Sequence, residues 1–219
     1  MNNKINYILA LGVIALALSI IIKPSPEVTP VDESLQLTNQ EEQSMPAPDK
    51  QYKQAEQVLE EGKSYSVTLT TTEGEITVEL DTTNTPITAN NFAFLAKDGF
   101  YDNTIFHRAL AGFMIQGGDP TGTGTGSPGY RFADEYLEGE YKRGTVAMAN
   151  SGPGTNGSQF FVMHADYALP NNYVIFGMVT EGLETVDAIA AAEVQPNSSG
   201  EPSSPVNPVS ITSATLNVQ

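Results

Sequence analysis

The apolar residues of the chain between positions 62 and 219 come in short runs divided by glycine, proline, asparagine and aspartate. Three such runs are residues 146–148, 160–163 and 174–176. Runs of this length are typical of buried β-strands and are too short for buried helices. This part of the chain is therefore expected to fold mainly from short strands.

Strict alternation of apolar and polar residues marks two further strands and a turn. Residues 65–69 and 76–80 alternate on either side of Thr72-Glu73-Gly74, which predicts a β-hairpin with one buried face. The carboxylates of Glu75 and Glu79 then fall on the wet face. Residues 209–218 alternate again and predict a last strand.

Two helices interrupt this strand pattern. Thr85 suits an N-cap, Pro86 suits the first helical position, and Gly99 suits the residue that follows the C-cap. A second helix is predicted over about residues 183–192. Many short strands with only two helices favour a closed antiparallel barrel over a sheet built from βαβ units.

Composition excludes several classes of protein. Of 219 residues, 40% are hydrophobic, which is enough for a packed core. The chain has no cysteine, so disulfides, cysteine-ligated zinc, thiol catalysis and lipid attachment to cysteine are excluded. It carries 26 acidic and 10 basic residues, a formal charge of −16, which argues against a nucleic-acid partner.

The N-terminal segment, residues 1–23, contains an apolar run over residues 5–22. As a helix this run would be about 27 Å long, close to the hydrocarbon thickness of a bilayer. We expect an uncleaved signal anchor, with a cleaved signal peptide ending near Ala15-Leu16-Ala17 as the alternative. Either one places the rest of the chain outside the cytoplasm, anchored to the membrane or, after cleavage, secreted or periplasmic.

Residues 24–61 are expected to form an acidic, proline-rich linker, with a possible short helix at 50–61. Asp49 would cap that helix and Gly62 would end it. The folded domain is then expected to span residues 62–219.

Common catalytic motifs are missing from this domain. Residues 121–126 read TGTGTG but lack the lysine that closes a phosphate-binding loop, so a surface loop is expected. His107 and His164 have no third ligand at a recognised spacing, which predicts no metal site. Ser158 does not lie in a nucleophile elbow.

Two segments, residues 106–119 and 148–161, combine apolar side chains with one guanidinium and several carboxamides. If Phe113, Met114 and Phe161 share a face, they form an apolar socket beside these polar groups. Such a site has no nucleophile and no general base. It suits the binding of a neutral peptide group better than the cleavage of a bond.

With the motifs FHR-x4-FMIQGGDPTGTGTG and MAN-x-GP-x-TNGSQFF in these segments, the chain resembles the cyclophilins, a family of peptidyl-prolyl cis-trans isomerases. The resemblance covers about residues 63–219 and is greatest to the compact bacterial form. It implies a mainly β fold, a closed eight-stranded antiparallel barrel capped by two α-helices. It implies no cofactor, a monomer, and proline-containing polypeptides as substrates.

The resemblance also implies a role for individual residues. Arg108 would be the catalytic side chain, and His107 would flank the site. The proline pocket would be lined by Phe113, Met114, Phe161 and Leu169, and the substrate backbone would be held by Gln116, Ala149, Asn150 and Gln159. Tyr173 would add an aromatic wall.

The chain departs from the family pattern in residues 165–174, where the loop is one residue shorter. Many members have a tryptophan where Ala168 stands, and they often have a histidine where Tyr173 stands. Without the tryptophan, weak or no cyclosporin binding is expected.

We therefore expect a prolyl isomerase that acts on unfolded or partly folded proteins outside the cytoplasm. A proline-peptide receptor or chaperone of the same fold, with negligible turnover, is the main alternative. A purely structural scaffold is the third hypothesis, after the enzyme and the receptor.

Overall fold

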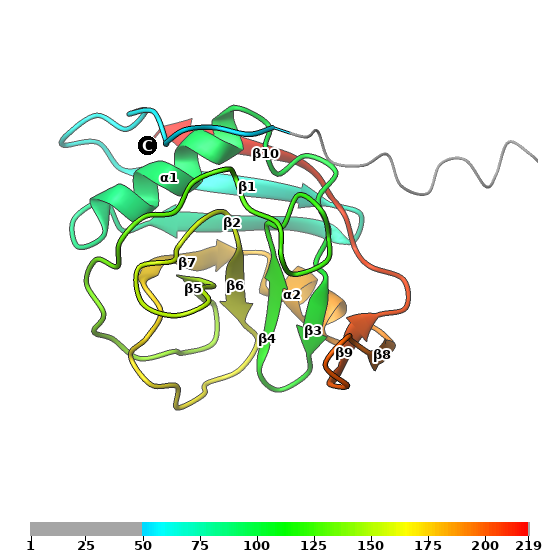
Figure 1. Cartoon of the computed structure of the whole chain (residues 1–219). Coiled ribbons are helices and arrows are strands. Elements are labelled where there is room, and N and C mark those ends of the chain that lie inside the picture. Colours follow the sequence, from blue (N-terminus) through cyan, green and yellow to red (C-terminus); the bar gives the residue numbers. More distant parts are fainter. Residues whose placement is uncertain (1–49, 219) are drawn as a thin grey trace, which may run out of the picture. The chain divides into compact units, whose positions relative to one another are not determined.

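The computed structural model describes residues 50–218 (Figure 1). The expectations for residues 1–23, and for the linker up to residue 49, lie outside the described residues. The strands are β1 (Tyr65–Thr71), β2 (Gly74–Leu80), β3 (Arg108–Leu110), β4 (Met114–Gly117), β5 (Thr145–Met148), β6 (Phe160–Met163), β7 (Ile175–Glu181), β8 (Val194–Pro196), β9 (Pro202–Pro205) and β10 (Ile211–Val218). The helices are α1 (Pro86–Lys97) and α2 (Leu183–Ala190).

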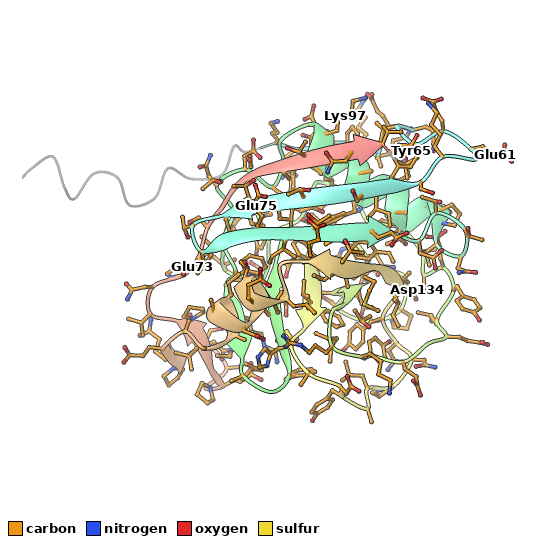
Figure 2. All side chains as sticks on the ribbon, turned by 180° about the vertical axis from the view of Figure 1, so that it is seen from behind. Glu61, Tyr65, Glu73, Glu75, Lys97 and Asp134 are labelled. Carbon is orange, nitrogen blue, oxygen red and sulfur yellow. The ribbon has the colours of Figure 1, made fainter. Side chains whose placement is uncertain are left out.

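Eight of these strands form one curled antiparallel sheet in the order β10-β1-β2-β7-β5-β6-β4-β3. The remaining two, β8 and β9, form a separate hairpin, which lies beside β3 in Figure 1. The predicted 65–80 hairpin is confirmed as β1 and β2, with Val67 opposite Val78. The exposed carboxylates of Glu73 and Glu75 lie at its turn, as Figure 2 shows.

The prediction of a closed barrel is wrong, because the sheet has two edges, β10 and β3, and is a half-barrel. The residues just before β3 contact the chain just before β10 through an isolated bridge, Ile105 with Ser210, and a hydrogen bond from Phe106 N–H to Val209 O at 3.0 Å. Within residues 50–218, β3 itself pairs with β4 and not with β10. The eight strands and two helices are otherwise as predicted.

Both predicted helices are confirmed. Helix α1 starts at Pro86 after Thr85, and the chain leaves it through Gly99 at φ 65°, a conformation that glycine adopts without steric cost. Helix α1 packs on β10 and β7, whereas α2 packs on β2, β3 and β4. Neither helix in residues 50–218 has the length and apolar character needed to cross a bilayer.

The central strands bury both of their faces, and successive side chains enter different apolar clusters. Phe160 packs in the main core with Phe92 and Phe176, whereas Phe161 packs in a smaller cluster with Met114 and Tyr141. Neighbouring residues of a strand point to opposite sides, so this division follows from the strand itself. The smaller cluster forms the floor of the site described below.

The predicted helix at residues 50–61 is wrong. These residues are an extended strap that packs Tyr52, Ala55, Val58 and Leu59 against the main core. Asn90 of α1 holds the strap: its Oδ1 accepts from Val58 N–H at 2.8 Å and from Leu59 N–H at 3.1 Å, and its Nδ2 donates to Glu56 O at 2.9 Å. Partners on α1 thus satisfy the backbone in place of helical hydrogen bonds.

Asn90→Ala is expected to destabilise the fold by about 1–3 kcal/mol, because two strap N–H groups lose their acceptor. Urea unfolding measures this loss, and limited proteolysis of the strap reports its release. The matched control is Asn84→Ala, since Asn84 is exposed and, within the part of the chain that the structure describes, its side chain bonds only to Asp81. Equal effects of the two changes would contradict the role assigned to Asn90.

Candidate active site

A cavity of about 150 Å³ opens above the smaller apolar cluster. It is lined by Arg108, Phe113, Met114, Gln116, Ala149, Asn150, Phe161, Leu169 and Tyr173. All nine were predicted as site residues, although they come from segments up to 65 residues apart, taking Arg108 and Tyr173 as the extremes. The structure therefore brings them together around one apolar pocket.

The aromatic side chains form the walls of this pocket. The rings of Phe161 and Tyr173 meet edge to face, with centroids 5.4 Å apart. Tyr141 supports Tyr173 from behind, donating from its hydroxyl to Tyr173 O at 3.0 Å. Phe113 packs against Tyr167, with ring centroids 4.6 Å apart. Neither Tyr141 nor Tyr167 was predicted as a site residue.

The β3–β4 hairpin places the polar groups of the site. Its register sets Arg108 opposite Gln116 and Leu110 opposite Met114. Because residues two apart share a face, Met114 and Gln116 point to the same side as Arg108. The pocket therefore receives an apolar side chain, a carboxamide and a guanidinium from one hairpin.

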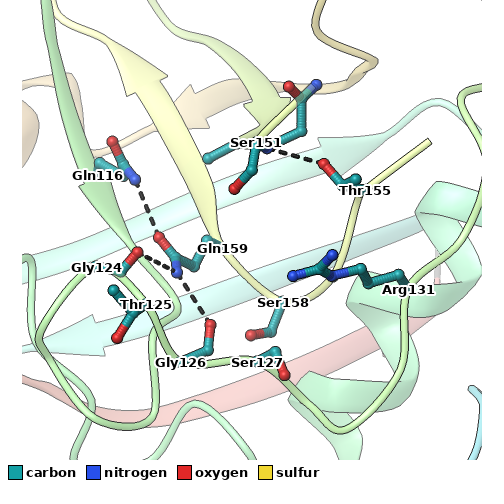
Figure 3. Close-up of a pocket in the computed structure, with 13 residues that line it drawn as sticks. Gln116, Gly124, Thr125, Gly126, Ser127, Arg131, Ser151, Thr155, Ser158 and Gln159 are labelled. Carbon is teal, nitrogen blue, oxygen red and sulfur yellow. Dashed lines mark hydrogen bonds between the residues drawn. The ribbon is translucent and has the colours of Figure 1, made fainter. Parts of the chain in front are cut away.

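A chain of hydrogen bonds fixes the orientation of the two glutamines (Figure 3). Gln159 Nε2 donates to the carbonyls of Gly124 and Gly126, at 3.1 and 3.0 Å. Its Oε1 then accepts from Gln116 Nε2 at 3.0 Å. Gln116 Oε1 is left to accept from Arg108 Nη1 at 3.3 Å. The carbonyls of the glycine-rich loop thus determine which atom of Gln116 faces Arg108.

The glycine-rich loop is held by a buried carboxylate. Asp119 Oδ1 accepts from the N–H and the hydroxyl of Thr121, at 2.7 and 2.8 Å, and Oδ2 accepts from Gly126 N–H at 3.0 Å. Burial alone would raise the pKa of Asp119, but these hydrogen bonds outweigh it and keep the pKa below its ordinary value. The loop therefore serves as a fixed support for Gln159.

A second, polar pocket of about 340 Å³ adjoins the first and shares Gln116, Ala149 and Asn150 with it. Gln159 lines this pocket and not the apolar one, and Arg131 lies across from it in Figure 3. The Asn150 side chain is occupied within the protein: Nδ2 donates to Asn172 O at 2.8 Å, and Oδ1 accepts from Gly152 N–H at 3.1 Å. These two bonds fix the orientation of the carboxamide and leave one Nδ2–H and one Oδ1 lone pair for a substrate.

His107 does not line the apolar pocket. Its ring lies under the glycine-rich loop, 3.7 Å from where a Cβ at Gly124 would stand. Neither ring nitrogen has a hydrogen-bond partner in residues 50–218. Burial, reinforced by the charge of Arg108 and opposed by Asp119, lowers the pKa of His107 from its ordinary 6.5.

Glu201 belongs to the site, although no motif in the sequence pointed to it. Its carboxylate accepts from Arg108 Nε at 2.7 Å and from Nη2 at 2.8 Å. The two residues are 93 positions apart, and Glu201 lies in a turn outside both motifs. Only the folded β8–β9 hairpin brings them together.

The pocket accepts an apolar ring, and a guanidinium stands at its edge beside two fixed carboxamides. Its lining residues include no nucleophile paired with a general base. Its chemistry is therefore limited to binding and to hydrogen bonding with a neutral group.

Comparison with known proteins agrees with this description. The family model described as "Cyclophilin type peptidyl-prolyl cis-trans isomerase/CLD" matches residues 66–216. A "Probable peptidyl-prolyl cis-trans isomerase B" of Mycobacterium tuberculosis is 40% identical over 193 residues, which cover 78% of this chain and 62% of that protein. The chain thus spans under two thirds of this relative. A "Peptidyl-prolyl cis-trans isomerase-like 1" of Gibberella zeae is 44% identical over 155 residues, covering 68% of this chain and 93% of the relative.

Solved structures give the same result. A cyclophilin-type isomerase of Cryptosporidium parvum has a TM-score of 0.65 and 37% identity, covering 70% of this chain and 98% of that one. The same protein in the presence of the dipeptide Ala-Pro has a TM-score of 0.64. The motifs, the curled eight-stranded sheet and these matches agree: the chain belongs to the family of cyclophilin-type peptidyl-prolyl cis-trans isomerases.

Proposed function

We propose that this chain accelerates cis-trans rotation of X–Pro peptide bonds in unfolded or partly folded proteins. The observation that carries the proposal is the position of Arg108 at the edge of the apolar pocket, with Nη1 directed toward Gln116. The related isomerase studied in the presence of Ala-Pro supports a proline-containing substrate.

The physical basis is differential stabilisation of the twisted bond. Rotation faces a barrier of about 18–20 kcal/mol, because the amide has partial double-bond character. In the twisted state the prolyl nitrogen regains a lone pair, which a donor stabilises more than either planar state. Arg108 is always protonated and offers N–H donors, while Phe113, Met114 and Phe161 hold the ring. An acceleration of about 10⁵ requires only about 7 kcal/mol.

A protease-coupled assay of the full chain with an Ala-Pro peptide tests this proposal. The protease cleaves only the trans form, so the expected result is a slow phase that speeds up in proportion to the chain added. An unchanged slow phase at all concentrations would contradict the proposal and favour a receptor without turnover.

The activity is expected to be independent of pH between about pH 7 and 9. Burial lowers the pKa of His107 from its ordinary 6.5, so its ring remains neutral in this range. Isomerisation followed by NMR exchange, which needs no protease, measures the profile. A rate that titrates within this range would contradict the expectation.

The lowered pKa of His107 also affects stability. Because the folded state disfavours the charged ring, His107 costs stability as the pH falls below about 6.5 and has no such effect above it.

We further propose that the apolar run of residues 5–22 tethers the domain to a membrane, with the domain outside the cytoplasm. The alternative is a secreted or periplasmic protein released by signal cleavage. Membrane fractionation with a carbonate wash distinguishes the two. Recovery of the full-length chain only in the soluble fraction would contradict the tether.

A further inference from the structure

The bond between Arg108 and Glu201 has the geometry that fixes a guanidinium in a plane. Nε donates to Oε2 at 2.7 Å and Nη2 donates to Oε1 at 2.8 Å, so the contact is bidentate. Both side chains are partly shielded, with exposed fractions of 30% and 35%. Bidentate arginine–carboxylate pairs add directional specificity that a single contact lacks.

The turn that carries Glu201 is itself well ordered. Asn197 Oδ1 accepts from Ser199 N–H at 2.9 Å and from Glu201 N–H at 3.0 Å, and Asn197 N–H donates to Glu201 O at 2.8 Å. Pro202 follows and restricts the backbone of Glu201. Strand β9 then packs on β3, the strand that begins at Arg108. The hydrogen-bonded turn and the packing of β9 on β3 therefore hold the carboxylate of Glu201 in place beside Arg108.

Glu201 and Gln116 hold the guanidinium from opposite sides. Glu201 occupies Nε and Nη2, whereas Nη1 faces Gln116 Oε1 at 3.3 Å and Met114 Sδ at 4.0 Å. Gln116 and Met114 line the apolar pocket, so Nη1 is the end of Arg108 that points to where a proline would bind. The other end is held away from the pocket.

We infer that Glu201 is a positioning residue for the isomerisation, which holds Arg108 so that Nη1 meets the twisted X–Pro bond. This inference rests on the proposed function. A donor that is already oriented stabilises the transition state without reorganising first. Because the effect acts on the transition state, the loss of Glu201 lowers the turnover and leaves peptide affinity nearly unchanged.

The carboxylate is ionised under all assay conditions. The hydrogen bond from Arg108, more than that from Ser203, lowers the pKa of Glu201 from 4.5 to about 2. The ion pair is therefore complete above about pH 4.5 and is lost only as the pH falls toward 2. Since partly exposed ion pairs contribute little to stability, removal of Glu201 leaves the fold intact.

The test compares Glu201→Gln with Glu193→Gln in the full chain. Glu193 is an exposed acid that precedes the same hairpin, and it has no ion pair within residues 50–218. NMR exchange on an Ala-Pro peptide gives the rotation rate at saturation and, separately, the dissociation constant. We expect Glu201→Gln to lower the rate by about 10-fold with the dissociation constant within about twofold. Glu193→Gln is expected to match the wild type, and Glu201→Asp to fall between.

A spectroscopic readout accompanies the kinetics. The Nε–H signal of Arg108, which is protected by the short bond to Glu201, is expected to shift and to exchange faster with water in Glu201→Gln. A wild-type rate in Glu201→Gln, a faster one, or an equal loss in both glutamine variants overturns the inference while the proposed function stands. An inactive wild type overturns the proposed function first, and the inference with it.

Discussion

Replacing Arg108 with alanine is expected to lower the rate of X–Pro rotation by about 100- to 1,000-fold. The variant loses the donor nearest the pocket, and among residues 50–218 no other cation lines the apolar cavity. The affinity for a proline peptide is expected to change little, because Phe113, Met114 and Phe161 still form its walls. The protease-coupled assay gives the rate, and NMR titration gives the affinity.

The matched control for this prediction is Lys97→Ala. Lys97, labelled in Figure 2, is an exposed cation in the last turn of α1 and does not line the pocket, so the change removes the same charge outside the site. Its rate is expected to equal that of the wild type. If Arg108→Ala also kept the full rate, Arg108 could not be the catalytic side chain.

Phe92→Ala is expected to destabilise the fold by about 3–5 kcal/mol. Phe92 is fully buried in α1, and its ring centroid lies 5.1 Å from that of Tyr101, 5.2 Å from that of Phe160 and 5.0 Å from that of Phe176. Truncation removes these contacts and leaves a cavity that a tightly packed aromatic cluster cannot close. Urea unfolding measures the loss.

Ile87→Ala provides the comparison within the same helix. Ile87 is 61% exposed, and its contact with Glu135 runs through the backbone N–H, which alanine retains. Its effect is expected to stay within about 0.5 kcal/mol. Comparable losses for Phe92→Ala and Ile87→Ala would mean that the aromatic cluster is not the centre of the core.

Local patterns in the sequence predicted the parts of the fold that depend on neighbouring residues. The β1–β2 hairpin follows from alternation around Gly74, and α1 follows from Pro86 and Gly99 at its ends. The division between Phe160 and Phe161 likewise follows from the two-residue period of a strand. The nine pocket residues were not predicted from local patterns but from the resemblance of two motifs and one loop to the cyclophilins.

Features that depend on distant partners could not be predicted in this way. The apolar spacing in residues 50–61 fits a helix, but Asn90 on α1 satisfies the extended backbone instead. Closure of the sheet depends on pairing between β3 and β10, which lie about 100 residues apart in the sequence, so no local pattern encodes it. Glu201 reaches Arg108 only because the β8–β9 hairpin packs on β3.

We expect the pocket and Arg108 together to turn the X–Pro bond and not merely to bind it. Two-dimensional NMR exchange on an Ala-Pro peptide, with a small amount of the full chain, tests this directly. Uncatalysed rotation takes about 10–100 s, so cross-peaks between the cis and trans signals at mixing times well below 1 s are the predicted result. Line broadening that reports binding, with no cross-peaks at those times, would contradict the claim.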